Sequence, residues 1–158
     1  MTSCATKPIV LSVVEPGHFH ASLVQKYDLE GVDRDVKVYA PEGPELDSYL
    51  AAIEGFNTRE DSPTHWNLTV SDGPLPPARG REVVVLSGNN IRKTANILDA
   101  VQKGYHVLAD KPLVVDYSQM PLLEKAFALA ADKGLVIQEL MTERSYPLVW
   151  SLEKEPAV

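Results

Sequence analysis

Residues 83–112, VVVLSGNNIRKTANILDAVQKGYHVLADKP, decide the fold of this chain. They open with a continuous β-branched apolar run, which predicts a strand buried on both faces. A polar turn at residues 87–90 follows, and apolar residues then recur at helical spacing until Gly104 ends the pattern. A second apolar run at residues 106–109 predicts the next strand. This order of strand, helix and strand is typical of a parallel β-α-β unit.

The rest of the chain repeats the same alternation. Further strands are predicted at residues 9–14, 36–40, 67–70 and 135–137. Further helices are predicted at residues 20–27, 46–53 and 120–130, the last with an apolar stripe that includes Phe127. Because crossovers between parallel strands are right-handed, the pattern predicts an α/β fold with a doubly wound, mostly parallel sheet flanked by helices.

Length, composition and charge exclude several classes of protein. The chain has 158 residues, 44% hydrophobic and 23% charged, which is the balance of one globular domain. A (β/α)₈ barrel is excluded because it needs about 250 residues. The net charge of −7 argues against non-specific binding to nucleic acid or to an anionic membrane, so neither is an expected partner. The single cysteine, Cys4, permits neither an internal disulfide nor a cysteine zinc cluster.

Both ends of the chain carry expectations about its context. The apolar stretch at residues 9–14 is far short of the roughly 20 residues that a membrane span requires, and it lacks the basic flank of a signal peptide. We therefore expect a cytoplasmic protein. Residues 148–158 have the pattern of a helix that ends without a cap, so we expect the chain to be part of something longer.

Small, polar and charged side chains follow the predicted strands at their carboxyl ends. In a doubly wound sheet, ligands bind in the crevice beyond these ends. The contrast between apolar strands and polar strand ends is the physical sign of a site in this sequence. The segments concerned are residues 15–20, 40–43, 87–90, 110–112 and 138–139.

The turn after the first strand is where a doubly wound sheet holds the pyrophosphate of a dinucleotide, against free N–H groups of the next helix. The fingerprint G-x-G-x-x-G places Glu15, Gly17 and His20 at its three glycine positions, so only Gly17 matches. Two interpretations stay open at this point: a pyrophosphate turn and an ordinary strand-to-helix turn.

The same turn raises the question of a metal, because His18 and His20 form an H-x-H pattern. Metal-dependent hydrolases of the barrel type use this pattern, but the chain is too short for that barrel. The remaining histidines are His65, which lies in a polar loop with Trp66, and His106, which lies at the start of a strand. Neither supplies a further ligand at a strand end, so we expect no metal site.

Two further strand ends carry candidate ligands. Gly88 lets a ligand approach the backbone, and the amides of Asn89 and Asn90 suit ribose or carboxamide groups, although either asparagine could instead be the N-cap of the helix. In Asp110-Lys111-Pro112, the proline directs Lys111 into an extended conformation that aims its ammonium across the strand ends. The alternative for that tripeptide is an ion pair on a surface loop.

The segment KGYHVLADKP at residues 103–112 resembles the Gfo/Idh/MocA oxidoreductases, whose N-terminal domain has an A-G-K-H-V-x-x-E-K-P segment at this place. The run PGHFHA at residues 16–21 resembles a G-H-x-H variant of their nucleotide turn. The run RSYP at residues 144–147 resembles their R-x-x-P segment after the last strand. The resemblance covers nearly the whole chain, and the branch known as putative oxidoreductases is the most similar.

This resemblance implies a Rossmann-like NAD(P)-binding domain over residues 1–147, with residues 148–158 beginning the connection to an absent C-terminal substrate domain. It implies that the absent domain makes the contacts of any homo-oligomer. Lys111 matches the family's lysine, which contacts substrate and cofactor and assists proton transfer, and Asp110 replaces the glutamate before it. The implied cofactor-binding set is Gly17, His18, Phe19, His20, Glu42, Ser87, Gly88, Asn89, Asn90 and Pro112.

The end of the second strand departs from the family pattern and bears on the choice of cofactor. The acidic residue that usually holds the adenosine ribose falls near Ala40, and Glu42 is the candidate to replace it. Because no Arg or Lys follows Ala40 to receive a 2′-phosphate, NAD is favoured over NADP.

We therefore expect the nucleotide-binding domain of an NAD-dependent oxidoreductase that acts on a sugar, polyol or related carbonyl substrate, with Lys111 and Asp110 as its catalytic residues. Two alternatives remain. One is a Rossmann-like domain without cofactor turnover that serves as a binding module, motivated by the poorly kept glycine turn and Ala40. The other, within the same family, is a glycosidase that uses tightly held NAD⁺.

Overall fold

The computed structural model describes residues 7–140 and centres on a six-stranded sheet in which every neighbouring pair is parallel. This confirms the predicted doubly wound α/β fold. Of the two central strands, β4 supplies a continuous apolar run at residues 83–86, and β1 is apolar except for the buried Ser12. In sheet order the strands are β3 (Asn67–Ser71), β2 (Asp35–Tyr39), β1 (Val10–Val14), β4 (Glu82–Leu86), β5 (His106–Asp110) and β6 (Ile137–Leu140).

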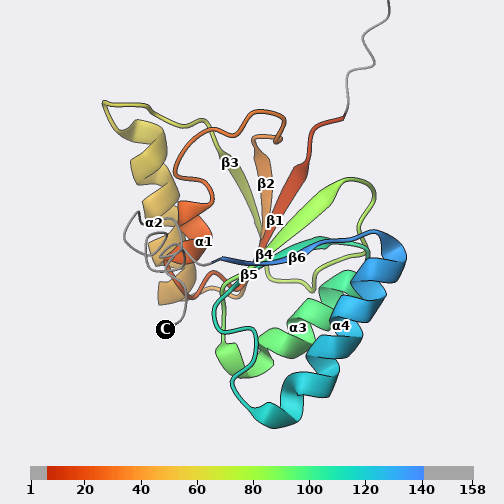
Figure 1. Cartoon of the computed structure of the whole chain (residues 1–158). Helices are drawn as coiled ribbons and strands as arrows, with labels where there is room; N and C mark the ends of the chain where they lie inside the picture. The colour runs from red at the N-terminus through yellow and green to blue at the C-terminus, as the bar shows by residue number, and fades with distance from the viewer. Residues whose placement is uncertain (1–6, 141–158) are drawn as a thin grey trace, which may run out of the picture.

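Helices cover both faces of the sheet (Figure 1). One face carries α1 (His20–Leu23) and α2 (Pro44–Thr58), and the other carries α3 (Asn90–Gln102) and α4 (Met120–Lys133). A short 3₁₀ helix, η1 (Tyr117–Gln119), leads into α4. The chain therefore forms three layers, and the central strands β1 and β4 are buried from both sides.

The burial of β4 explains why its sequence does not alternate. Val84 packs in the core under α3 and α4, while Val85 packs in the core under α1 and α2, and both are fully buried. An apolar side chain on each face contributes about 1.5–3 kcal/mol when it is fully removed from water. Both faces of the central strands therefore need apolar residues.

The helix α1 is shorter than the predicted residues 20–27. It is α-helical only as far as Leu23, and the chain continues in tighter turns in which the Gln25 N–H bonds to the Ser22 carbonyl at 2.9 Å. The cause is tertiary, because Gln25 is drawn into the core. Its carbonyl accepts the indole N–H of Trp66 at 2.7 Å, and its side chain accepts the hydroxyl of Tyr49.

The last strand begins later than predicted, at Ile137 rather than residue 135. Gly134 ends α4 in the left-handed conformation with φ 65°, and the Leu135 N–H still bonds back to the Ala130 carbonyl at 2.8 Å. The helix cap therefore uses the first residue of the apolar run, and the strand can start only after it.

Two side chains pack differently from the expectation. Trp66 lies in the loop before β3, as predicted, but it is 3% exposed and belongs to the core that α2 covers. Phe127 was placed on the buried face of α4, but it is 45% exposed, and the face that packs against the sheet and α3 consists of Leu123, Ala126 and Ala130. The small side chains of Ala126 and Ala130 let α4 pack closely against α3.

Within residues 7–140, no helix is long and apolar enough to cross a membrane. Cys4, the segment at residues 144–147 and the predicted domain boundary after residue 147 lie outside the described residues.

Candidate functional site

The carboxyl ends of four neighbouring strands surround a cavity of about 600 Å³. It lies beyond β1 and β4, where the connections from the two strands leave to opposite faces of the sheet, which is the expected ligand position in this topology. Eight of the twelve predicted site residues line it. The lining residues are Glu15, Gly17, His18, Pro41, Glu45, Ser87, Gly88, Asn89, Asn90, Arg92, Asp110 and Lys111.

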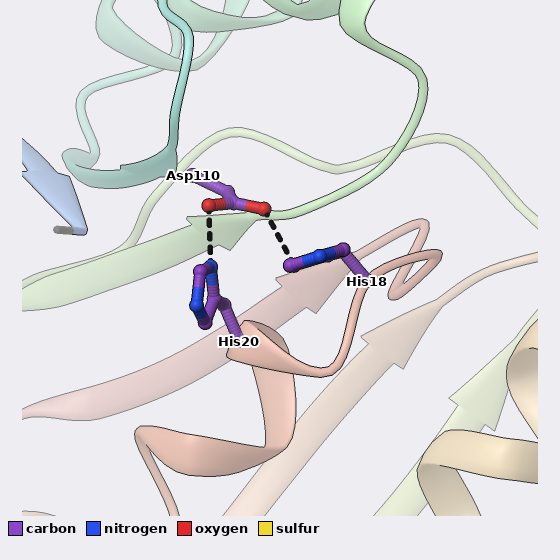
Figure 2. Close-up of side chains that lie close together, drawn as sticks. All are labelled: His18, His20 and Asp110. Carbon is purple, nitrogen blue, oxygen red and sulfur yellow. Dashed lines mark hydrogen bonds and ion pairs between the residues drawn. The ribbon is translucent and has the colours of Figure 1, made fainter. Parts of the chain in front are cut away.

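At the inner edge of this cavity, one carboxylate lies between two imidazoles (Figure 2). Asp110 Oδ1 is 2.6 Å from His20 Nδ1, and Asp110 Oδ2 is 2.9 Å from His18 Nδ1. The side chains of His20 and Asp110 are 2% and 4% exposed, whereas that of His18 is 46% exposed. The H-x-H pattern of the first turn thus meets a residue 90 positions later in the chain.

Asp110 also fixes the backbone of the lysine that follows it. Its Oδ1 accepts the backbone N–H of Lys111 at 2.8 Å, and the Lys111–Pro112 peptide bond is cis. Lys111 is half-buried and lines the cavity. Asp110 thus pairs with His18 and His20 through its carboxylate and contacts Lys111 through the backbone N–H, which fixes the position of the Lys111 backbone.

A buried lysine also stabilises the turn that carries Lys111. Lys93 on α3 is 2% exposed, and its ammonium donates to Asn90 Oδ1 at 2.5 Å and to the Lys111 carbonyl at 3.4 Å. Burial lowers the pKa of Lys93, and the negative charges of Asp110 and Glu139 act in the opposite direction. Lys93 thus ties the turn after β4 to the turn after β5.

The turn after β4 shows which asparagine caps the helix. Asn89 is the N-cap of α3, and its side chain accepts the Ile91 N–H at 2.8 Å, while Asn90 binds Lys93. The N-cap alternative is therefore confirmed for Asn89. Ser87 is fully buried, and its hydroxyl donates to the His18 carbonyl at 3.1 Å, which joins this turn to the turn after β1.

The turn after β1 departs most from a phosphate-binding turn. Glu15, at the first glycine position of the fingerprint, has φ 45°, a left-handed conformation that favours glycine. Its carboxylate accepts the guanidinium of Arg92 at 2.9 and 3.1 Å. Gly88 packs against it so closely that an added Cβ would lie 2.7 Å from Glu15 Cβ. Gly88 is therefore required by its protein neighbour.

A second carboxylate lies beside the one matching glycine. A Cβ added to Gly17 would meet Glu45 Oε2, from the first turn of α2, at 3.1 Å. The helix α1 has only four residues, so its dipole offers little to an anion. The β1–β2 side of the cavity thus combines an open glycine with two acidic side chains, Glu15 and Glu45.

Four predicted cofactor-binding residues do not line this cavity. His20 is buried behind it, and Pro112 lies beyond Lys111 on the exposed turn. Phe19 is 62% exposed and lines a smaller hollow between the β1 turn and α2. Glu42 lines a separate hollow with Gly43, Leu46, Asp47, Leu50 and Val70.

Sequence reasoning missed the roles of Glu45, Arg92 and Lys93, and it treated Glu15 only as a missing glycine. All four are charged residues that follow closely after a strand. That closeness to a strand end is the one local signal in the sequence that could have identified them as site residues. Their contacts reach across elements, from α2 to the β1 turn and from α3 to the β1 and β5 turns, so spacing along the chain does not reveal them.

Comparison with known proteins gives matches among solved structures only. No family model matches the chain, and no curated protein does. The crystal structure of a putative oxidoreductase from Parabacteroides merdae ATCC 43184 matches with a TM-score of 0.82 and 37% sequence identity, over 93% of this chain and 34% of that protein. The chain is thus similar to an oxidoreductase of which it spans about a third.

Two more distant structures share the fold. Biliverdin reductase from Synechocystis sp. PCC 6803, in complex with biliverdin and NADP⁺, has a TM-score of 0.68 and 14% identity over 95% of this chain and 43% of its own. The 3-ketoreductase KijD10 from Actinomadura kijaniata, in complex with TDP-benzene and NADP, has a TM-score of 0.63 and 20% identity over 92% of this chain and 42% of its own. These matches confirm a Rossmann-like fold.

Proposed function

We propose that this chain is the nucleotide-binding domain of a nicotinamide-dinucleotide-dependent oxidoreductase of the Gfo/Idh/MocA type. The observation that carries the proposal is the cavity at the β1–β4 switch point, which brings Gly17, residues 87–90 and Lys111 to one crevice. The similarity to an oxidoreductase at 37% identity supports the same class of activity. The domain boundary after residue 147 and a further substrate domain are part of this proposal.

The residues present fit a dinucleotide that lies along the strand ends. Gly17 is the place of close approach, since only the flexible end of the exposed Glu45 side chain would meet a group added there. The turn at residues 87–90 and Lys111 line the opposite side, where the ribose and nicotinamide would be held. Arg92 already neutralises Glu15, which leaves Glu45 as the charge that opposes a pyrophosphate.

A nicotinamide ring, when bound, supplies or accepts a hydride. The chain's own contribution is a proton at the substrate oxygen. The Lys111 ammonium would hold a carbonyl oxygen and give it a proton as it becomes a hydroxyl, and the amine would take that proton back in the oxidation direction. Asp110 acts by fixing the Lys111 backbone. A sugar, polyol or related carbonyl compound is the proposed substrate class, and the match to a 3-ketoreductase supports it.

The residues after β2 favour NAD over NADP. The segment at residues 40–47, APEGPELD, holds three acidic residues and no basic one, so a 2′-phosphate would meet repulsion. The two distant structural matches that bind NADP point the other way, at 14% and 20% identity. We propose NAD because the residues that would face the 2′ position belong to this chain.

The test is a titration of the purified chain with NADH and with NADPH, followed by nicotinamide fluorescence and heat. The expected result is saturable one-to-one binding with NADH the tighter ligand. A Gly17→Ala variant should keep its melting temperature and lose most NADH binding, because the methyl group fills the place of closest approach. Gly55→Ala, on α2 with open space around it, is the matched control and should bind normally.

A binding module without nicotinamide cofactor is the second candidate, and the carboxylate of Glu45 beside Gly17 favours it. Absence of binding at millimolar NADH and NADPH by a folded sample would favour this module over the oxidoreductase. Tighter binding of NADPH than of NADH would instead keep the oxidoreductase and overturn the choice of cofactor.

A further inference from the structure

We propose that His18, His20 and Asp110 form a binding site for a divalent transition-metal ion of the Zn²⁺ or Co²⁺ type. Two imidazoles and one carboxylate are a ligand set that such ions take in proteins. The three ligand atoms lie within 4.8 Å of one another. This inference does not depend on the proposed cofactor, because it rests on these three side chains alone.

The site is built from two distant segments and is held in place by the fold. Asp110 ends β5, and the two histidines stand in the turn after β1 and at the start of α1 (Figure 2). His20 and Asp110 are almost fully buried. Their side chains therefore lose their conformational freedom on folding, and ion binding does not have to order them. The side chain of His18 is 46% exposed, so it has room to reorient toward an ion held by the other two residues.

The observed contacts are close to those that a metal would impose. Two ligand atoms bonded to one ion at about 2.1 Å lie about 3.0 Å apart at a right angle and about 3.4 Å apart in a tetrahedron. His20 Nδ1 lies 2.6 Å from Asp110 Oδ1 and His18 Nδ1 lies 2.9 Å from Asp110 Oδ2, so with both carboxylate oxygens facing the ion each pair needs to open by less than about 1 Å. A bound ion would replace the two Nδ1 hydrogens as the link between imidazole and carboxylate.

The charges around the cluster include both signs. Glu45 lines the same cavity and favours a cation, while Lys111 and Lys93 oppose one. Asp110 itself supplies the nearest negative charge, and Arg92 is already paired with Glu15. The charges around the cluster therefore permit a divalent ion, because one of its three ligands is the negatively charged carboxylate of Asp110.

An ion at this place would keep open positions toward the cavity, because His18 and Asp110 line the cavity wall. Three protein ligands with a free position are typical of catalytic rather than structural metal sites. The open position would take water or an oxygen of a small molecule, and a carbonyl oxygen bound there would be polarised.

The experiment uses the whole 158-residue chain and Co²⁺ as the probe. Visible absorption of Co²⁺ and heat of binding are measured at pH 7.5 for the unaltered chain and for His18→Gln, Asp110→Asn and His65→Gln. The expected result is one Co²⁺ per chain, with binding at least about tenfold weaker in His18→Gln and Asp110→Asn. His65→Gln removes an exposed histidine that also pairs with an aspartate, Asp28, and should bind Co²⁺ as the unaltered chain does.

Folding is checked separately, because loss of the buried Asp110 carboxylate can destabilise the chain. His18 is half-exposed, so His18→Gln is expected to keep the melting temperature within about 2 °C and carries the test by itself. Absence of stoichiometric Co²⁺ binding, or equal binding by the unaltered chain and His18→Gln, would overturn the proposal. A histidine NMR spectrum that retains both Nδ1–H signals in excess Zn²⁺ would overturn it as well.

Discussion

The two sides of the cavity are built differently. The β4–β5 side, with the turn at residues 87–90 and with Asp110 and Lys111, is held by buried contacts and begins a 13-residue helix with a side-chain cap. The β1–β2 side, with Glu15, Gly17 and Glu45, begins a four-residue helix and carries two acidic side chains where a phosphate would lie. The difference indicates that the β4–β5 side is the more firmly held of the two, so we expect the β1–β2 side to be the one that adjusts if the proposed dinucleotide binds.

The largest expected effect concerns the link between the two sides. Asp110→Ala removes a buried carboxylate that accepts from both imidazoles and from the Lys111 N–H, and it leaves those donors unpaired. We expect a loss of about 3 kcal/mol in the free energy of unfolding, measured by urea denaturation. Asp110→Asn keeps an acceptor oxygen and should lose less. Equal stability of the alanine variant would show that the two sides do not depend on this link.

The next prediction tests whether Gly88 is required for packing against Glu15 or for the close approach of a ligand. Gly88→Ala places a methyl group 2.7 Å from Glu15 Cβ and 2.8 Å from the Glu15 carbonyl, so the two turns must separate. We expect a loss of about 2 kcal/mol in thermal or urea unfolding. Gly80→Ala, with open space around it, is the control. A neutral Gly88→Ala would mean that the contact between the two sides is looser than the structure indicates.

A smaller effect would sharpen the electrostatic part of the comparison. Glu45→Gln removes one negative charge beside Gly17, and we expect NADH to bind about fivefold more tightly at low ionic strength, because one unit charge near 4 Å in water is worth about 1 kcal/mol. The matched control is Asp47→Asn, in the same helical turn but lining a different hollow. Weaker NADH binding by Glu45→Gln would mean that this side chain contacts the ligand favourably.

The smallest effect lies away from the cavity, beside the amino-terminal ends of β2 and β3, and serves as a reference for the effects at the cavity. Asp28 accepts from the His65 side chain at 2.9 Å and from Arg34 at 3.0 Å, and the hydrogen bond from His65 lowers the pKa of Asp28, with the Arg34 charge adding to it. Its contribution to stability is therefore present above the unfolded-state pKa of about 3.9 and is lost as the pH falls through the lower folded-state pKa.

We expect Asp28→Asn to cost about 0.5 kcal/mol at pH 7, since the pair is largely at the surface, and to cost nothing near pH 2. Urea denaturation at the two pH values measures the difference. A cost that persists unchanged at pH 2 would show that the effect is one of packing rather than charge.

The sequence predicted the six strands, and most clearly the central β4, because a strand buried on both faces needs an apolar run and that requirement is local. It also predicted the edge of the sheet that holds the cavity, since parallel strands place their polar ends together. The length of α1 could not be predicted, because Gln25 leaves the helix to meet Trp66 and Tyr49 from elsewhere in the chain.

The candidate site likewise has features that follow from the local sequence and features that depend on tertiary contacts. The sequence by itself determined which residue types stand at the strand ends, among them His18, His20, Asp110 and Lys111, because strand and turn signals are encoded within a few residues. Only the tertiary structure decided that Asp110 lies between the two histidines and that Glu15 packs on Gly88 and binds Arg92. These contacts join segments about 70 to 90 residues apart, and such distances are fixed by how the strands pair in the sheet rather than by any local pattern.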